Sequence, residues 1–211
     1  MAIHQNPAES AESEVRPRRR ADWRRRLPVL ANAQVTLRAL RETDAASLLA
    51  HLSTSPVQRY IAPCPDSVEG LRRFVRWTRA ERRRGLHVCY GIVPRGRAKP
   101  VGIIQLWAIE RDFSTAEWGF ALSDRYWGSG LFASAARLLL DFAFGMLGVQ
   151  RLEARAVDAD DHGNGSLRKL GATREGVLRE GFRSGDQVRD YVMWSILADE
   201  WRRTGHLEET H

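Results

Sequence analysis

A glycine-containing loop decides the fold of this chain. It reads Ser123-Asp124-Arg125-Tyr126-Trp127-Gly128-Ser129-Gly130-Leu131-Phe132-Ala133. The two glycines allow successive backbone N–H groups to turn into one concavity. The helix expected after the loop adds its unpaired N–H groups and the positive end of its dipole. The loop therefore predicts a seat for an anionic group such as a pyrophosphate, without a basic side chain.

The glycine spacing fits more than one interpretation. Gly128, Gly130 and Ala133 match the dinucleotide-binding pattern of two glycines and an alanine. That pattern belongs to the first turn of a parallel β-α-β unit, whereas three antiparallel strands are expected before this loop, so we reject it. A glycine-rich helix start without any ligand is a second interpretation. A nucleotide P-loop is excluded, because no Gly-Lys-Ser or Gly-Lys-Thr follows the glycines.

The pattern on both sides of the loop predicts a mixed sheet. Helical periodicity predicts helices at 44–52, 66–84, 134–147 and 164–170. Thr43 is the expected cap of the first helix, and Asp66 with Glu69 forms the expected capping box of the second. Alternating apolar residues between turn signals predict strands at 35–39, 88–93, 101–109, 115–122, 151–157, 175–183 and 188–196. The expected fold class is α/β, with a mostly antiparallel sheet of about seven strands and helices on both faces.

Composition limits the functional classes. The 211 residues suffice for one domain with a full core. Cys64 and Cys89 offer no disulfide framework, and the six histidines show no metal-ligand spacing. The apolar runs end well before membrane-spanning length, and no secretory signal precedes them. We therefore expect a cytoplasmic protein without a metal site or a membrane contact.

The first residues differ in character from the rest. Residues 1–33 are expected to form a flexible, arginine-rich arm, because they lack an apolar period and contain prolines. Arginines surround Trp23, so the arm could contact RNA or the ribosome by charge and stacking, although a solvated tail is the plainer interpretation. The main domain is expected at residues 34–203, with a tail at 204–211.

Several short motifs in order resemble the GNAT superfamily of N-acetyltransferases. Its central motif is Gln or Arg, two residues, Gly, one residue, then Gly or Ala. Aligned on Gly130, Trp127 takes the first position and Phe132 the last, and both depart from the general pattern. Trp127-Gly128 after Tyr126 is similar to the branch of ribosomal-protein N-terminal acetyltransferases. Further matching pieces across residues 34–201 are Val35-Thr36-Leu37-Arg38, Ala116-Glu117-Trp118-Gly119-Phe120, Leu170-Gly171-Ala172 and Asp190-Tyr191.

The resemblance implies a GNAT-like fold and transfer of acetyl from acetyl-coenzyme A (acetyl-CoA), a cosubstrate, to a primary amine. The favoured acceptor is a protein N-terminal α-amine. A small-molecule amine is an alternative, as is a non-catalytic acyl-CoA-binding module docking on RNA or the ribosome. In the family two strands splay apart around the pantetheine arm, here 115–122 and 151–157. The pyrophosphate would lie on the backbone of Trp127, Gly128, Ser129, Gly130, Leu131, Phe132 and Ala133.

The same resemblance assigns roles within the site. Backbone N–H groups near Phe120, Ala121 and Leu122 would polarise the acetyl carbonyl. Glu117 is the expected general base, although an exposed glutamate paired with an arginine is equally consistent with the sequence. Asn164 could bond the pantetheine or merely cap a helix. Ser166 is a hydroxyl near Asn164 in the same region. Tyr191 could protonate the departing thiolate, but it is a weaker candidate, since aromatic strand residues usually belong to the core.

Overall fold

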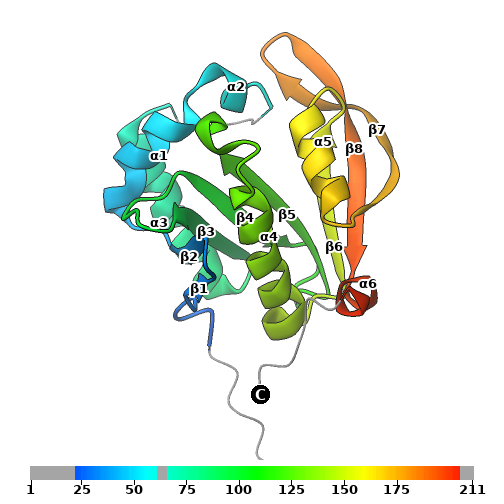
Figure 1. Cartoon of the computed structure of the whole chain (residues 1–211), viewed down its shortest axis with the longest axis horizontal. Helices are drawn as coiled ribbons and strands as arrows, with labels where there is room; N and C mark the ends of the chain where they lie inside the picture. The colour runs from blue at the N-terminus through cyan, green and yellow to red at the C-terminus, as the bar shows by residue number, and fades with distance from the viewer. Residues whose placement is uncertain (1–21, 61–65, 205–211) are drawn as a thin grey trace, which may run out of the picture.

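The computed structural model describes residues 22–60 and 66–204, and it forms one eight-stranded sheet in the order β1-β2-β3-β4-β5-β6-β8-β7 (Figure 1). Every neighbouring pair is antiparallel except β5 with β6. The expected fold class is confirmed, with one strand more than expected. The strands are β1 Leu30–Ala31, β2 Val35–Ala39, β3 His87–Pro94, β4 Gly102–Ala108, β5 Thr115–Leu122, β6 Arg151–Val157, β7 Thr173–Ser184 and β8 Gln187–Leu197.

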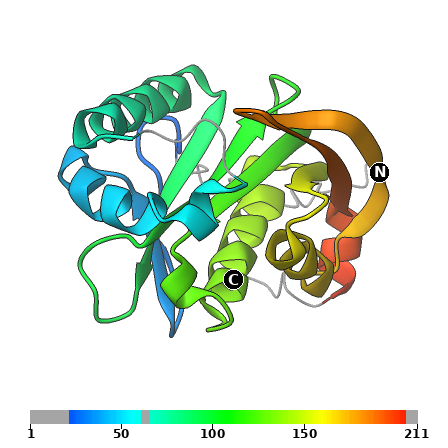
Figure 2. The ribbon, with the colours of Figure 1, turned by 90° about the horizontal axis from the view of Figure 1, so that it is seen from above.

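Helices cover both faces of this sheet, as Figure 2 shows from above. Within the described residues, no helix is both long and apolar enough to cross a membrane. The α-helices are α1 Ala45–Leu52, α2 Ser55–Gln58, α3 Val68–Arg84, α4 Leu131–Asp141, α5 Asp161–Lys169 and α6 Ala198–Arg203. The tighter or wider turns are η1 Glu42–Asp44, η2 Asp124–Tyr126 and η3 Phe142–Leu147, the last a π-helical continuation of α4.

Two apolar layers hold the helices to the sheet. On one face α1 and α3 bury Leu48 and Val75 against Ile103 of β4. On the other face α4 buries Leu139 against the larger cluster that contains Ile104. Ile103 and Ile104 are neighbours on one strand, so alternation along the strand separates the two layers.

The structured part begins earlier than the expected boundary at residue 34. Leu30 and Ala31 pair with β2 as the extra strand. Leu27 is buried, and the ring of Trp23 packs edge-on against Phe113 with centroids 5.5 Å apart. The assignment of residues 22–33 to a flexible arm was wrong, because these apolar residues are spaced singly and show no period. Residues 1–21 and 205–211 lie outside the described residues.

Two predicted caps also differ from the structure. At α1, Asp44 rather than Thr43 occupies the N-cap position, and its side chain makes no hydrogen bond to the helix because it accepts the Arg41 N–H at 2.9 Å instead. At α3, Ser67 is the cap and its hydroxyl accepts the Gly70 N–H at 3.1 Å. In each case the N-cap position falls on the residue directly after the predicted one, and Ser67 alone of the two caps its helix through its side-chain oxygen.

Two helices begin three residues earlier in the structure than the sequence predicted. Leu131 starts α4 instead of residue 134, because Gly130 adopts a left-handed conformation, φ +80°, that brings the chain directly into the helix. Asp161 starts α5 instead of residue 164, and Asp160 caps it by accepting the Gly163 N–H at 2.9 Å. The loop before α4 is consequently shorter than the sequence suggested.

A buried ion pair anchors β2 to the start of α1. The Asp44 side chain is fully buried, and Arg38 donates to its two oxygens at 2.7 and 3.0 Å. Burial alone would raise the pKa of Asp44, but the Arg38 guanidinium, the Arg41 N–H and the charge of Lys99 together lower it. The ionised carboxylate therefore stabilises the folded state.

We expect Asp44→Asn to lower the free energy of unfolding at pH 7 by roughly 3 kcal/mol, because it leaves the Arg38 charge poorly paired. Urea denaturation measures this loss. The depressed pKa means that the contribution is complete above the ordinary aspartate pKa and is lost as pH falls through the folded-state value. The variant should therefore lose less stability than the wild type on acidification. Glu42→Gln, which removes an exposed partner of Arg76, should change stability by less than about 1 kcal/mol.

Candidate active site between the separated strands

Strands β5 and β6 part after a short parallel contact. Only Thr115–Glu117 and Arg151–Glu153 are paired. Beyond them, β5 stays paired with β4 as far as Leu122, and β6 stays paired with β8 as far as Val157. A cavity of about 600 Å³ opens between the diverging halves. The expected splaying of these two strands is confirmed.

Hydrogen bonds to β4 fix the direction of the β5 backbone. Ser123 donates its N–H to the Val101 oxygen at 3.0 Å, and Thr115 accepts the N–H of Ile109 at 3.0 Å. Residues with odd numbers on β5 therefore point their backbone groups toward β4. Because backbone groups alternate along a strand, those of the even-numbered residues point into the gap.

This alternation distinguishes the three backbone donors that were expected. Phe120 and Leu122 direct their N–H groups into the gap, whereas Ala121 directs its own toward β4. In agreement, the Leu122 oxygen is not paired with β4 but accepts the indole N–H of Trp127, in the loop after β5, at 3.0 Å. The expectation for the Ala121 N–H was wrong, although its residue still lines the cavity.

The glycine loop has the conformation that an anion seat requires. Gly128 and Gly130 have φ of +72° and +80°, and a Cβ on either would meet no atom within 4 Å. Both glycines line the cavity at the start of α4. Open space beside left-handed backbone is where a phosphate could approach the amides closely.

Part of the predicted seat is occupied by the loop itself. Trp127 donates its N–H to the Asp124 oxygen, Ser129 donates to the Tyr126 oxygen, and Leu131 donates to the Ser129 hydroxyl. These three N–H groups were expected to contact the pyrophosphate and are engaged within the loop. Within residues 127–133, all of which the structure describes, the N–H groups without an acceptor are those of Gly128, Gly130, Phe132 and Ala133.

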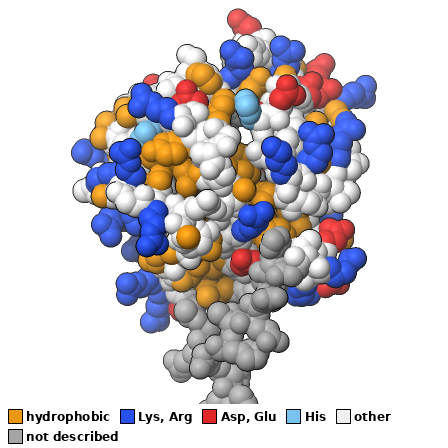
Figure 3. All heavy atoms as spheres, in the orientation of Figure 1, with side chains coloured by type: hydrophobic (Ala, Val, Ile, Leu, Met, Phe, Trp, Pro, Cys, Tyr) orange, Lys and Arg blue, Asp and Glu red, His pale blue; other side chains and the backbone are white. Residues whose placement is uncertain are grey.

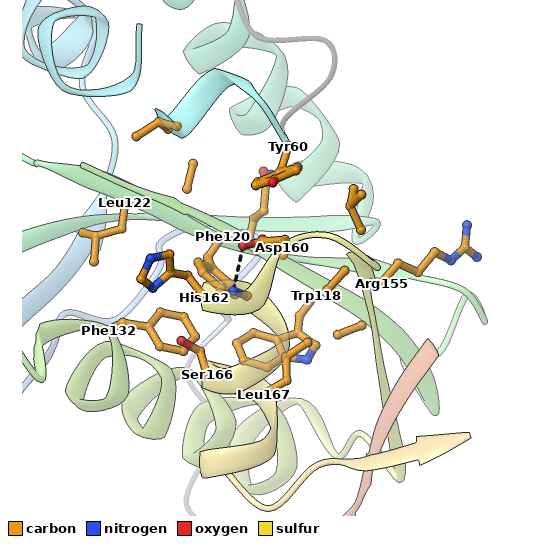
Figure 4. Close-up of a pocket in the computed structure, with 18 of the residues that line it drawn as sticks. Tyr60, Trp118, Phe120, Leu122, Phe132, Arg155, Asp160, His162, Ser166 and Leu167 are labelled. Atoms are coloured by element: carbon orange, nitrogen blue, oxygen red, sulfur yellow. Dashed lines mark hydrogen bonds between the residues drawn. The ribbon is translucent and has the colours of Figure 1, made fainter. Parts of the chain in front are cut away.

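Apolar rings form the floor on the α4 side of the gap. In Figure 4, Trp118 and Phe120 of β5 lie beside Phe132 of α4, with Ser166 and Leu167 of α5 next to them. The Phe120 and Phe132 ring centroids are 4.0 Å apart. Figure 3 shows apolar side chains gathered near the centre of this face with Lys and Arg toward its sides. This side suits the apolar stretches of a long, flexible ligand.

Asn164 has a structural position rather than a free side chain. Its amide nitrogen donates to the oxygens of Val157 and Asp160 at 2.8 and 2.9 Å, and its oxygen accepts the Trp194 indole N–H at 2.9 Å. We therefore withdraw Asn164 as a pantetheine contact. Its amide holds the end of β6 against α5 and β8, which keeps the cavity wall in place.

Two contacts that the sequence did not reveal are made by aromatic side chains that line the cavity. The rings of Trp127 and His162 lie with centroids 4.7 Å apart, which joins the glycine loop to α5. Tyr60, directly after α2, donates its hydroxyl to the Ala159 oxygen at 3.0 Å. No local motif marks such contacts, because each joins segments far apart in the sequence.

Glu117 lies on the opposite side of the sheet from the Trp118 and Phe120 side chains. It lines the cavity, is about half-buried, and lies 3.6 Å from the Arg155 guanidinium. Burial raises the pKa of Glu117, the charge of Arg155 opposes the rise, and Glu153 adds to it. Glu117 therefore pairs with an arginine and also lines a cavity, and its role as general base stays a prediction.

The other titratable side chains discussed for this cavity are less suited than Glu117 to accept a proton. Asp160 is half-buried, burial raises its pKa, and its carboxylate is engaged in capping α5. Tyr191 lines the cavity, and burial raises the pKa of its phenol, so the hydroxyl keeps its proton near neutral pH. In the part of the chain that the structure describes, no three His, Cys, Asp or Glu side chains gather closely enough to hold a metal ion.

Comparison with known families decides the assignment. The profile of the acetyltransferase (GNAT) domain matches residues 34–173, about two thirds of the chain. The chain belongs to the GNAT family of acetyltransferases. It is an acetyl-CoA-dependent N-acetyltransferase.

Similar proteins cover nearly the same length. YoaA of Bacillus subtilis strain 168, an uncharacterised N-acetyltransferase, is 25% identical over 81% of this chain and 97% of its own. YdaF of the same organism, named as a candidate ribosomal N-acetyltransferase, is 26% identical over 81% of this chain and 94% of its own. Spermidine N(1)-acetyltransferase of Escherichia coli strain K12 is 28% identical over 47% of this chain and 54% of its own.

Solved structures agree on the fold. A candidate acetyltransferase from T. thermophilus superposes with a TM-score of 0.71 at 29% identity, covering 83% of this chain and 92% of that one. Mycobacterium smegmatis RimJ in complex with CoA-disulfide superposes with a TM-score of 0.71 at 20% identity, covering 82% and 90%.

The glycine loop can be tested with a matched pair of variants. We expect Gly130→Trp to abolish the rise in melting temperature that acetyl-CoA gives the wild type, because the side chain would fill the space beside the free amides. Gly96→Trp is the control, since Gly96 has a similar φ of +77° and equally open surroundings in the β3–β4 turn. Both variants should lose similar intrinsic stability, but Gly96→Trp should keep the shift. An unchanged shift in Gly130→Trp would contradict this placement of the cofactor.

Proposed function

We propose that the cavity binds acetyl-CoA along β5 and catalyses acetyl transfer to a protein N-terminal α-amine on the Glu117 side. The separation of β5 from β6 carries this proposal, because it leaves the Phe120 and Leu122 N–H groups facing an open gap. A pantetheine arm can pair with such a strand as an added strand would. The amides of Gly128, Gly130, Phe132 and Ala133 would bind the pyrophosphate.

Alternation along β5 assigns a side to each substrate. Trp118 and Phe120 point to the α4 side, where the glycine loop lies, so the cofactor would approach there. Glu117 and Gly119 point to the α3 side, so the amine would approach there. The two substrates would meet at the strand itself, within reach of a backbone N–H that faces the gap.

Residues of this chain can then support each part of the transfer. The thioester supplies the acetyl group when acetyl-CoA is bound; the nitrogen–carbon bond forms as the carbon–sulfur bond breaks. Glu117 would accept the proton of the attacking amine, directly or through one water. The Phe120 N–H would stabilise the carbonyl oxygen as it gains charge. Tyr191, still protonated near neutral pH, could return a proton to the departing sulfur.

The acceptor is proposed from similarity. YdaF, named for ribosomal N-acetylation, aligns over most of this chain, whereas the spermidine enzyme aligns over less than half of it. The loop motif Tyr126-Trp127-Gly128 also resembles the branch that acts on ribosomal proteins. We therefore favour a protein N-terminal α-amine over a small polyamine. Contact with RNA or the ribosome through the expected arm stays a prediction, because residues 1–21 lie outside the described residues.

Glu117→Gln tests the chemistry. We expect it to preserve the acetyl-CoA thermal shift while lowering kcat by about 100-fold or more, because the variant lacks the proton acceptor. In the wild type, the rate should rise with pH through a group whose pKa lies above that of an ordinary glutamate, and the variant should lack this limb. Thiol release against pH measures both effects. A kcat within a few-fold of wild type would remove Glu117 from the mechanism.

Glu153→Gln serves as the matched control on the neighbouring strand. Its carboxylate accepts a hydrogen bond from Arg151 at 2.8 Å and does not line the cavity. Its charge raises the pKa of Glu117. We therefore expect this variant to retain turnover and to move the acidic limb of the rate profile to lower pH.

A further inference from the structure

An aromatic wall runs from the Glu117 carboxylate to helix α3. Trp107 stands directly opposite Glu117 on the neighbouring strand. Its ring leans over Gly119, where an added Cβ would lie only 3.2 Å from it. Trp77 of α3 follows, 44% exposed, and stacks with Phe74 at a centroid separation of 5.9 Å. Trp107, Trp77 and Phe74 all line the cavity.

A buried histidine joins the two tryptophans. The His87 ring lies with its centroid 4.9 Å from that of Trp77 and 5.4 Å from that of Trp107. Burial lowers the pKa of His87 to about 4, although the Gln105 hydrogen bond opposes this shift. The ring is therefore neutral near pH 7, and it adds no positive charge behind the wall that would repel a cationic amine.

Charge on the acceptor side is sparse. Among the described residues that line the cavity, Arg155 is the one arginine or lysine, and the acidic side chains are Glu117 and Asp160, of which Asp160 already accepts the Gly163 N–H as the cap of α5. The Glu117 carboxylate already lies 3.6 Å from Arg155. A substrate with a second ammonium group would find the other carboxylate of the lining engaged in a helix cap and would be repelled by Arg155. The lining therefore matches one nitrogen next to an apolar group.

We propose that this site selects a singly charged amine with a flat, apolar substituent near the nitrogen, and that Trp77 and Trp107 determine the selection. The proposal rests on the proposed function and narrows its acceptor. The substituent would stack on the tryptophan faces while the nitrogen lies beside Glu117. Gly119 matters because it has no side chain, since a Cβ at this position would crowd the Trp107 ring and force it to shift. The same chemistry occurs in arylalkylamines and in peptides that begin with an aromatic residue.

The test compares acceptors at saturating acetyl-CoA. We expect kcat/KM for phenethylamine to exceed that for n-butylamine by about tenfold or more, the effect of one well-packed ring, and spermidine to be poorest. A peptide beginning with Phe, compared with one beginning with Ser, shows whether the preferred source is a peptide or a free amine. An equal or higher value for n-butylamine or spermidine would overturn the proposal.

Variants of the exposed wall residue separate selection from folding. Trp77→Leu should raise KM for phenethylamine about tenfold and leave n-butylamine and the acetyl-CoA thermal shift unchanged. Trp77→Phe keeps an aromatic face and should retain most of the preference. A loss that is equal for all acceptors in Trp77→Leu would overturn the assignment. Turnover without any ring preference contradicts this inference alone, whereas binding of acetyl-CoA without turnover of any amine contradicts the proposed function as well.

Discussion

The early separation of β5 from β6 is the constraint on which the rest of the structure depends. Two strands that part inside a protein expose backbone groups that cost free energy unless they find partners. One side chain satisfies the final carbonyl of each strand: the Trp127 indole donates to Leu122, and the Asn164 amide donates to Val157. The last carbonyl of each strand thus already accepts a hydrogen bond. The remaining gap-facing backbone groups of β5 stay available to a ligand that pairs with them as a neighbouring strand would.

The two-residue period of β5 then gives the cavity two different sides. Even-numbered side chains build the apolar floor against α4, and odd-numbered ones face the helices on the other side. The same alternation turns the Phe120 N–H into the gap between the two sides. In the proposed function, one strand would therefore separate the two substrates, hold the proposed base on one side and offer a backbone donor where they meet. Burial that shapes the cavity also raises the pKa of Glu117, which suits it to accept a proton near neutral pH.

Features encoded locally could be predicted from the sequence, and features that depend on distant contacts could not. The strands, their antiparallel order and the glycine loop follow from periodicity and turn residues. Sequence could not show that Asn164 is engaged by Trp194, thirty residues away. It also gave no reason to single out Trp77, because only the tertiary structure brings its ring against His87. Leu30–Ala31 escaped detection because a two-residue strand has no measurable period.

Charge is distributed so that the outer surface and the cavity favour different partners. The net charge of +7 comes largely from surface arginines such as Arg76, which is paired with Glu42 and Glu69 on the outer side of α3. A positive field of this kind attracts the phosphates of coenzyme A and opposes the approach of a polycation. Inside, the acceptor side carries little charge and much aromatic surface. In the proposed function, the long-range field would therefore favour the anionic cofactor, and the local contacts would favour a lightly charged, apolar amine.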